Sequence, residues 1–373
     1  MNTEPPEAPP ATEGVPIADA GADANEAATS AISADGATAG SPVEHGPQLT
    51  ELTELAEPPE PPEPPEPPIR ARSLALVDAS RARLEELLVA PGHGAEAIHD
   101  FRVALRRLRS ALRPLALIHS RGFTRRAGAA LRAIADLTGE LRDEEVLRET
   151  LTELELPEAR EAISTWMRGR ARREEGLRGR VHKRLLDRRA DIEAQLETVR
   201  ARFVEGPETT MSDAEFAIEA LRKAIDKVAL RAADANVDDV ASMHKIRIAA
   251  KLTRYTAELV DGLADVGAKK PMKLATKLQK NYGRLHDLDE ALIRMERARG
   301  LEPRARLAVM KALGQERDAL AERLVAEVHA DVTTLQDAIA RTTAVFERRR
   351  ERERPVEGEA TSRTEEPERR EGE

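Results

Sequence analysis

The feature that most constrains the fold of this chain is a pattern of residues that occurs twice, in the same order and register. Residues 99–109 align without a gap on residues 244–254, and residues 138–143 align on residues 282–287 at almost the same separation. Two blocks that keep their spacing indicate a duplicated structural unit. The chain is therefore expected to form two matching halves.

Both halves are predicted to be helical. Residues 69–347 are rich in Leu, Ala, Arg and Glu, poor in aromatic residues, and interrupted by Gly and Pro at wide intervals. These residues favour helices, and strand patterns are nearly absent, so the expected fold class is all-α. A turn-rich linker at 206–210 separates halves at about 69–205 and 212–347. Ser212 and Glu215 then have the spacing of a capping box that begins the second half.

The apolar spacing and the breaking residues predict the individual helices. We expect them at about 74–88, 95–119, 124–137, 144–153, 157–202, 212–232, 239–263, 271–284, 287–299 and 303–346. The long helix at 157–202 is expected to bend at Gly169, Gly176 or Gly179, and Pro114 is expected to kink the helix at 95–119.

The two ends of the chain differ from this body in charge and composition. Residues 1–68 are rich in Pro, Glu and Ala, and contain 14 acidic residues and no Lys or Arg, which leaves 59 basic and 54 acidic residues in the rest. Such a segment is predicted to be disordered, with its Glu-Pro-Pro repeat forming a polyproline II spacer. Residues 348–373 are predicted to be a charged disordered tail. The body is therefore mildly basic.

Composition also limits the compartment and the chemistry. The chain has no Cys, which excludes disulfides and thiolate metal sites. No apolar stretch approaches the roughly 20 residues that span a bilayer, and the N-terminus lacks the pattern of a signal peptide. The histidines lack the spacing of a metal motif. We expect a cytoplasmic protein with no membrane span, no catalytic residues, no cofactor and no metal ligands.

The duplicated helices carry the candidate binding residues. In both copies the basic residues recur at i, i+3, i+7 and i+10, which places them on one helix face. The first column is His99, Arg102, Arg106 and Arg109; the second is His244, Arg247, Lys251 and Arg254. Such a column repels itself unless carboxylates or an anionic ligand offset the repulsion. Arg and Lys suit phosphate, and a stripe suits a linear chain of phosphates. The alternative is a solvated helix face.

Three further sets of residues have open roles. His99 and His244 are expected to contact phosphate or a neighbouring helix rather than a metal. Asp143 and Asp287 are expected to orient the basic columns or to cap the next helix, because a carboxylate that faces phosphate repels it. A stripe of Lys273, Lys277 and Lys280 is equally consistent with a wider basic surface and with a solvent-facing one.

The blocks His-Asp-Phe-Arg-Val-Ala-Leu-Arg-Arg-Leu-Arg and Met-His-Lys-Ile-Arg-Ile-Ala-Ala-Lys-Leu-Thr-Arg-Tyr, with a Gly-x-Leu-x-Asp segment, resemble the CHAD family, the conserved histidine α-helical domain. The resemblance covers about 70–346. It implies two pseudo-symmetric four-helix-bundle-like halves about a basic groove, and binding of inorganic polyphosphate, in some members at polyphosphate or storage granules. It implies that both columns bind, with weaker candidates at Arg107, Arg132, Lys277 and Lys280. Asp136, beside this surface, departs from the pattern.

Other functions remain as alternatives. Nucleic acid also presents phosphates, although the few aromatic residues offer little stacking. A helical signalling or scaffold role, with the acidic segment as the partner contact, is a second alternative. Granule-associated proteins are candidate partners only if the chain binds polyphosphate. A metal-dependent phosphohydrolase is a third, because His99-Asp100 and His286-Asp287 are His-Asp pairs, but Lys245 replaces the acid in the second copy. A further hypothesis is that the acidic segment of the same chain occupies the basic groove and competes there with the ligand.

Overall fold

The computed structural model describes residues 68–90, 94–154 and 160–353, and these form helices with no strand among them. The predicted all-α class is confirmed. The elements are α1 (Ile69–Val89), α2 (Ala95–Leu115), α3 (Arg121–Asp136), α4 (Gly139–Thr152), α5 (Arg160–Asp187), α6 (Arg189–Glu205), α7 (Asp213–Ala232), α8 (Val240–Val260), η3 (Leu263–Asp265), α9 (Lys269–Glu296) and α10 (Pro303–Glu353). The predicted disordered segment at 1–68 lies almost wholly outside the described residues.

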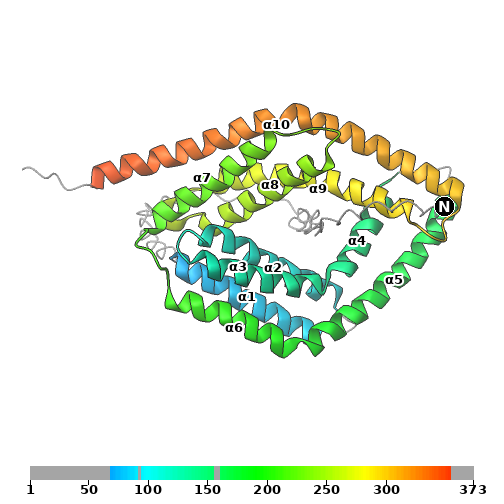
Figure 1. Cartoon of the computed structure of the whole chain (residues 1–373), viewed down its shortest axis with the longest axis horizontal. Helices are drawn as coiled ribbons and strands as arrows, with labels where there is room; N and C mark the ends of the chain where they lie inside the picture. The colour runs from blue at the N-terminus through cyan, green and yellow to red at the C-terminus, as the bar shows by residue number, and fades with distance from the viewer. Residues whose placement is uncertain (1–67, 91–93, 155–159, 354–373) are drawn as a thin grey trace, which may run out of the picture.

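The helices pack in two groups that follow the chain (Figure 1). In the first group α2 packs against α1 and α3, α6 against α1, and α5 against α4. In the second group α8 lies between α7 and α9, and α10 covers α7 and α9. The groups meet where α2 contacts α8 and where α4 contacts α9. The twofold relation between the halves stays a prediction.

The two central helices owe their position to one apolar face each. On α2 the side chains of Phe101, Leu105 and Leu108 are buried, and on α8 those of Ile246 and Ala250 are buried. Burying one large apolar side chain stabilises a fold by roughly 1.5–3 kcal/mol, so these faces hold both helices in the core. The basic columns lie on other faces of the same helices.

The residues predicted as a turn-rich linker, 206–210, lie outside helices, between α6 and α7. Gly206 adopts a positive φ of 89° after α6, which favours glycine, and Ser212 and Glu215 form the expected capping box at the start of α7. Between them the backbone N–H of Glu208 donates to the carbonyl oxygen of Ile118, 2.7 Å away. This bond ties the linker to the turn that follows α2.

The second half has one helix where two were predicted. Helix α9 runs without a break through the expected boundary between 284 and 287, and Asp287 is buried inside it. The equivalent place in the first half is broken, because Leu137 and Thr138 form a turn between α3 and α4. There the Thr138 hydroxyl donates to the carbonyl oxygen of Ala135, 2.8 Å away, and such a local bond competes with the helix ladder. The proposed capping role of Asp287 is wrong.

The bend predicted at a glycine of the 157–202 helix is also wrong. The helix breaks at Arg188, between α5 and α6, while Gly169, Gly176 and Gly179 stay helical. An interior glycine costs a helix only about 1 kcal/mol relative to alanine. Buried Leu177, among others, outweighs this cost. The predicted start at Pro157 lies outside the described residues.

Two helix ends differ from the prediction. Helix α2 ends at Leu115, directly after Pro114, instead of continuing to 119 with a kink. Proline supplies no backbone N–H to the helix ladder, so a stop at this position is a normal consequence. Helix α10 continues past the expected end at Phe346 to Glu353, and the rest of the predicted C-terminal tail lies outside the described residues.

Two buried carboxylates hold α5 on the first group. Glu144 accepts from Arg170 at 2.6 Å and from Arg173 at 3.2 Å. Glu174 accepts from Arg148 at 2.6 Å and also from Arg178. Both glutamate side chains are only 3% exposed, and a buried charge is tolerated when it is paired and hydrogen-bonded.

Candidate functional site

The two predicted basic columns lie on helices that contact one another. Arg106 on α2 donates to the hydroxyl of Tyr255 on α8, 3.3 Å away, and Arg107 forms an ion pair with Glu258 at 2.7 Å. Both contacts join the two halves. The structure therefore places the two columns on neighbouring helices.

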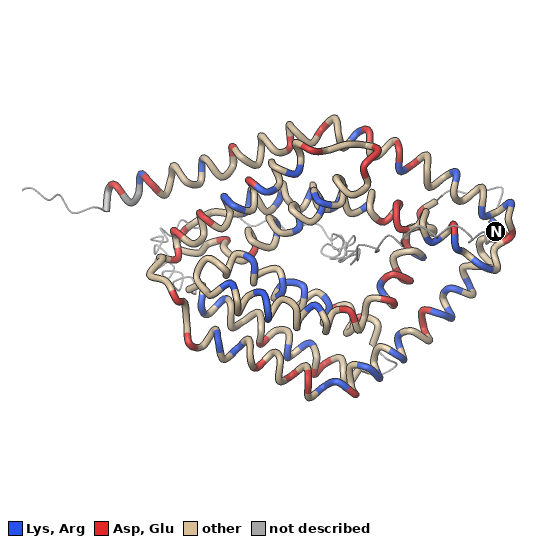
Figure 2. The backbone as a smooth tube through the Cα atoms, in the orientation of Figure 1, with Lys and Arg blue, Asp and Glu red and all other residues tan. Residues whose placement is uncertain are grey.

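A cavity of about 640 Å³ lies beside this contact, between α2, α3 and α8. Six cationic side chains line it: Arg109, Arg113, Arg125, Arg132, Arg247 and Lys251. No Asp or Glu occurs among the described residues of its lining. Figure 2 shows Lys and Arg gathered on α2, α3 and α8 and acidic residues prominent on α4. Positive charge from both halves thus converges on one hollow. A cavity with such walls focuses an attractive potential on anions.

The rest of the lining is apolar or small. Leu112, Ile248 and Leu252 contribute aliphatic side chains, and Gly128 and Ala129 of α3 bring backbone close to the hollow. Arg247 is 2% exposed, so part of the cationic lining is shielded from bulk water. Electrostatic attraction is stronger in such surroundings than at an open surface. No aromatic residue occurs among the described residues of the lining.

The other members of the columns make different contacts. Arg102 donates to the carbonyl oxygen of Thr138 at 3.3 Å, in the turn between α3 and α4. Arg254 donates to Gln279 at 3.4 Å, and its guanidinium lies 5.0 Å from the centre of the Tyr255 ring. His99 is half-buried near the start of α2. The described lining of the cavity includes none of these, nor Arg106 or His244. The columns are therefore divided between the cavity and the surrounding helix contacts.

The histidine of the second column contacts a neighbouring helix, as was expected. His244 Nδ1 lies 3.3 Å from Nδ1 of His286 on α9. Burial lowers the pKa of His286 to about 3, and the positive charges of Arg247, His244, Lys251 and Arg294 act in the same direction. His286 is therefore neutral at pH 7, and a neutral imidazole both donates and accepts.

Carboxylates gather at the other contact between the halves, where α4 meets α9. Asp143 lies inside α4 and forms an ion pair with Arg294 of α9 at 2.8 Å, so the capping role expected for it is wrong. The expected role in orienting a basic column stays a prediction. Burial raises the pKa of Glu290 at this contact, against the lowering effect of Arg294. Burial also raises the pKa of Glu145, elsewhere on α4, against the lowering effects of Arg142 and Arg102. This acidic contact contrasts with the cation-lined cavity.

The four weaker candidates for polyphosphate binding also differ in whether they line the cavity. Arg132 lines the cavity, whereas Arg107 pairs with Glu258. Lys277 pairs with Asp331 of α10 at 3.0 Å, and Lys280 is exposed on α9. Asp136, the last residue of α3, is exposed.

Sequence reasoning missed two of the cavity cations. Arg113 follows Arg109 by four residues on α2, so it continues the first column by one helical turn. Arg125 precedes Arg132 by seven residues on α3, a spacing that also places two side chains on one face. The column pattern could have found Arg113. Nothing in the duplicated blocks pointed to α3.

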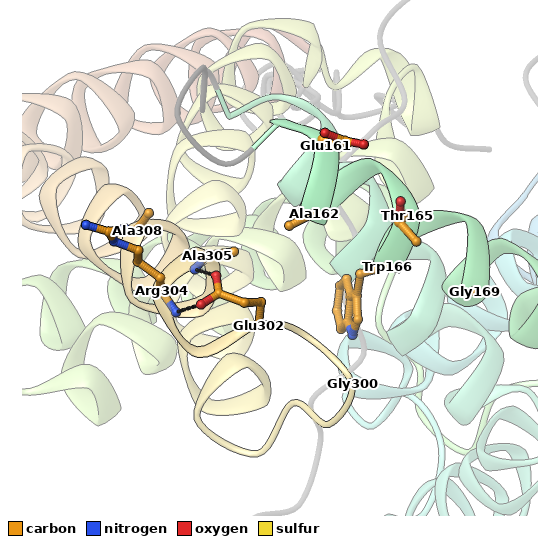
Figure 3. A pocket seen from close by; sticks show the side chains of 10 residues that line it. All are labelled: Glu161, Ala162, Thr165, Trp166, Gly169, Gly300, Glu302, Arg304, Ala305 and Ala308. Carbon is orange, nitrogen blue, oxygen red and sulfur yellow. Dashed lines mark hydrogen bonds between the residues drawn. The ribbon is translucent and has the colours of Figure 1, made fainter.

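A second hollow of about 1000 Å³ lies between the starts of α5 and α10 (Figure 3). Its lining combines Glu161, Glu302 and Arg304 with the Trp166 ring. Glu302 accepts hydrogen bonds from the backbone N–H groups of Arg304 and Ala305, at 3.0 and 2.8 Å. This carboxylate caps α10, and the mixed charge does not favour a polyanion. Within the described part of the chain no three or more His, Cys, Asp or Glu side chains are grouped so that they could hold a metal ion. None of the described helices combines the length and the apolar character that a membrane span requires.

The comparison with known families decides the identity of the fold. The family described as the CHAD domain matches residues 74–296, which is more than half of the chain. The chain belongs to the CHAD domain family. The matched range contains α2, α3 and α8, so the cation-lined cavity lies wholly within the CHAD domain, whereas α10 follows the matched range.

A solved structure supports the same fold. The chain is similar to the crystal structure of the CHAD domain from the plant Ricinus communis, with 24% sequence identity and a TM-score of 0.56. The match covers 72% of this chain and 92% of that chain. At this identity the likeness shows the fold. No match to a curated protein was found.

Proposed function

We propose that this CHAD domain binds inorganic polyphosphate, without catalysing a reaction on it, in the cavity between α2, α3 and α8. One observation carries the proposal: six cations from both halves line a single cavity, with no acidic residue among the described residues of the lining. Five of the six are arginines, whose planar guanidinium donates two hydrogen bonds to phosphate or carboxylate oxygens. The proposal includes a cytoplasmic location for the protein, in association with polyphosphate or storage granules.

The size of the cavity favours a chain of phosphates over nucleic acid. Its volume of about 640 Å³ lies within the range of roughly 300–1,000 Å³ that is usual for small-molecule sites. A duplex is too wide to enter such a hollow. Single strands are generally held by stacking on aromatic side chains, and the described lining offers none. Linear polyphosphate has no bases, so its binding requires neither a surface that fits a duplex groove nor aromatic side chains for stacking.

The proposal is tested with two arginines of α3 that differ in position. Arg125 and Arg126 are both exposed, but of the two only Arg125 is among the described residues that line the cavity. Long-chain polyphosphate should bind the wild type and Arg126→Ala with equal affinity. Arg125→Ala should bind it roughly 10-fold more weakly, which corresponds to the loss of about 1.4 kcal/mol expected for a charged hydrogen bond.

Competition identifies the ligand class. Duplex DNA should displace bound polyphosphate poorly, and pyrophosphate should require a much higher concentration because it engages fewer cations. Equal affinities for polyphosphate and DNA would favour the nucleic-acid alternative. Equal affinities of the Arg125 and Arg126 variants would remove the cavity from the proposal.

A further inference from the structure

The acidic N-terminal segment complements the charge of the cavity. Residues 1–56 contain ten acidic residues and no Lys or Arg, and four more glutamates follow in the Glu-Pro-Pro repeat. The cavity lining carries six cations and, among its described residues, no acid. We propose that the carboxylates of residues 4–54 bind in the cavity and compete there with polyphosphate. The competition rests on the proposed function, whereas the contact within the chain does not.

The segment joins the body close to the helix that lines the cavity. At the start of α1 the backbone N–H of Ile69 donates to Asp213, 3.3 Å away. One turn later Arg72 donates to the carbonyl oxygens of Leu259 and Asp261, at 3.1 and 2.6 Å, and so caps the end of α8. Leu252, which lines the cavity, precedes Leu259 by seven residues on that helix, or about 10 Å along its axis.

The length of the segment suits a return to the cavity. Glu54, the nearest of the ten acidic residues, precedes Ile69 by fifteen residues, and Glu4 precedes it by 65. Because an extended chain spans up to about 3.3 Å per residue, the segment has enough length to reach the cavity from the start of α1. A binding group tethered within reach acts at an effective concentration on the order of millimolar.

The contact between the acidic segment and the cavity cations is expected to be one that polyphosphate can displace. A carboxylate presents two oxygens to a guanidinium in the same bidentate manner as phosphate. Each carboxylate, however, carries one charge on a loosely spaced segment, whereas polyphosphate repeats its charges closely along one chain. The segment therefore weakens the binding of polyphosphate without abolishing it, and both contacts weaken as salt is added.

A cross-linking experiment tests the contact by itself. A carbodiimide joins a carboxylate directly to a lysine amine, and the cavity contains one lysine, Lys251. In the full-length protein, residues 4–54 should link to Lys251, with a yield that does not depend on protein concentration and that falls when polyphosphate is added. Lys245, which is exposed on the same helix and does not line the cavity, provides the internal comparison. Equal or stronger linking to Lys245, or no link to Lys251, would overturn the contact.

An affinity measurement tests the competition. The variant has the ten acidic residues of 4–54 replaced by Gln or Asn in the full-length chain, and the control has the seven glutamates of 357–373 replaced by Gln. A segment that fills the cavity nine-tenths of the time lowers the apparent affinity about tenfold, so the variant should bind polyphosphate about tenfold more tightly than wild type. The control should match wild type. Equal affinities of variant and wild type overturn the competition but leave the proposed function intact. If no protein binds polyphosphate, the proposed function fails and the cross-link alone decides the contact.

Discussion

Acidification should weaken the fold through His286, the buried histidine that faces His244. Its pKa falls from the ordinary 6.5 to about 3 because burial disfavours the imidazolium, and Arg247 and Lys251 add positive charge nearby. Its Nε2 is buried and has no hydrogen-bond partner within the described part of the chain, so no existing hydrogen bond would stabilise a second proton. Asp143, Asp287 and Glu290 line the same small cavity, and Asp143 and Glu290 pair with Arg294.

The sign and size of the effect follow from the two pKa values. Between pH 6.5 and pH 3 the unfolded chain binds a proton at this position and the folded protein does not, so the free energy of unfolding falls as the pH falls. From pH 6.5 to pH 4.5 the loss from this one group is about 2 kcal/mol. Above pH 6.5 the group has little further effect.

The assay is urea unfolding followed by circular dichroism at several pH values. Wild type, His286→Gln and His329→Gln are compared, since His329 is an exposed histidine on α10. Because other groups also titrate in this pH range, the effect of His286 is measured as the difference in unfolding free energy between wild type and each variant. His286→Gln should lose about 2 kcal/mol less than wild type between pH 6.5 and 4.5, and His329→Gln should follow wild type. Identical pH profiles for wild type and His286→Gln would refute the argument.

Three further changes test the packing of the body by the same unfolding assay. Glu174→Gln removes a buried charge that accepts from two arginines, and it should lower the free energy of unfolding by about 3 kcal/mol. Glu175→Gln, at the exposed neighbouring position, should lower it by less than about 0.5 kcal/mol. Similar losses for the two variants would contradict the role given to the buried charge. Leu108→Ala, at a fully buried position of α2, should cost about 2–5 kcal/mol, and Leu230→Ala, 62% exposed on α7, should cost far less. Ser212→Ala should cost about 1 kcal/mol by removing the capping box of α7, and an unchanged stability would show that the cap is dispensable.

The sequence was most informative where a local rule decides the structure. Apolar spacing predicted the helices, and the spacing of Ser212 and Glu215 predicted a cap that depends on neighbouring residues alone. The rules failed where packing outweighs them. Gly176 stays inside α5 because buried neighbours offset its weak helix preference. Helix α9 passes through the expected boundary because Leu285 and Leu288, at and just after it, are buried in the core.

The candidate site was predicted in part for a similar reason. The column pattern identified Arg109, Arg247 and Lys251, because residues on one helix face can be found from spacing. It did not identify Arg125, because the approach of α3 to α2 and α8 is a tertiary arrangement that spacing along one helix does not contain. It also treated all column members alike, although Arg102 turns to the carbonyl oxygen of Thr138.

The central claim is that cations from both halves act on one ligand in one cavity, and the salt dependence of polyphosphate binding tests it most directly. The double variant Arg125→Ala with Lys251→Ala removes one cavity cation from each half, and Arg126→Ala with Lys245→Ala removes two cations that do not line the cavity. For a single-stranded polyanion, each neutralised phosphate contributes about 0.7 to the slope of log affinity against log salt. The account predicts that the slope of the first double variant is smaller than that of wild type by about 1.4, with an unchanged slope for the second. Equal slopes for the two double variants would contradict it.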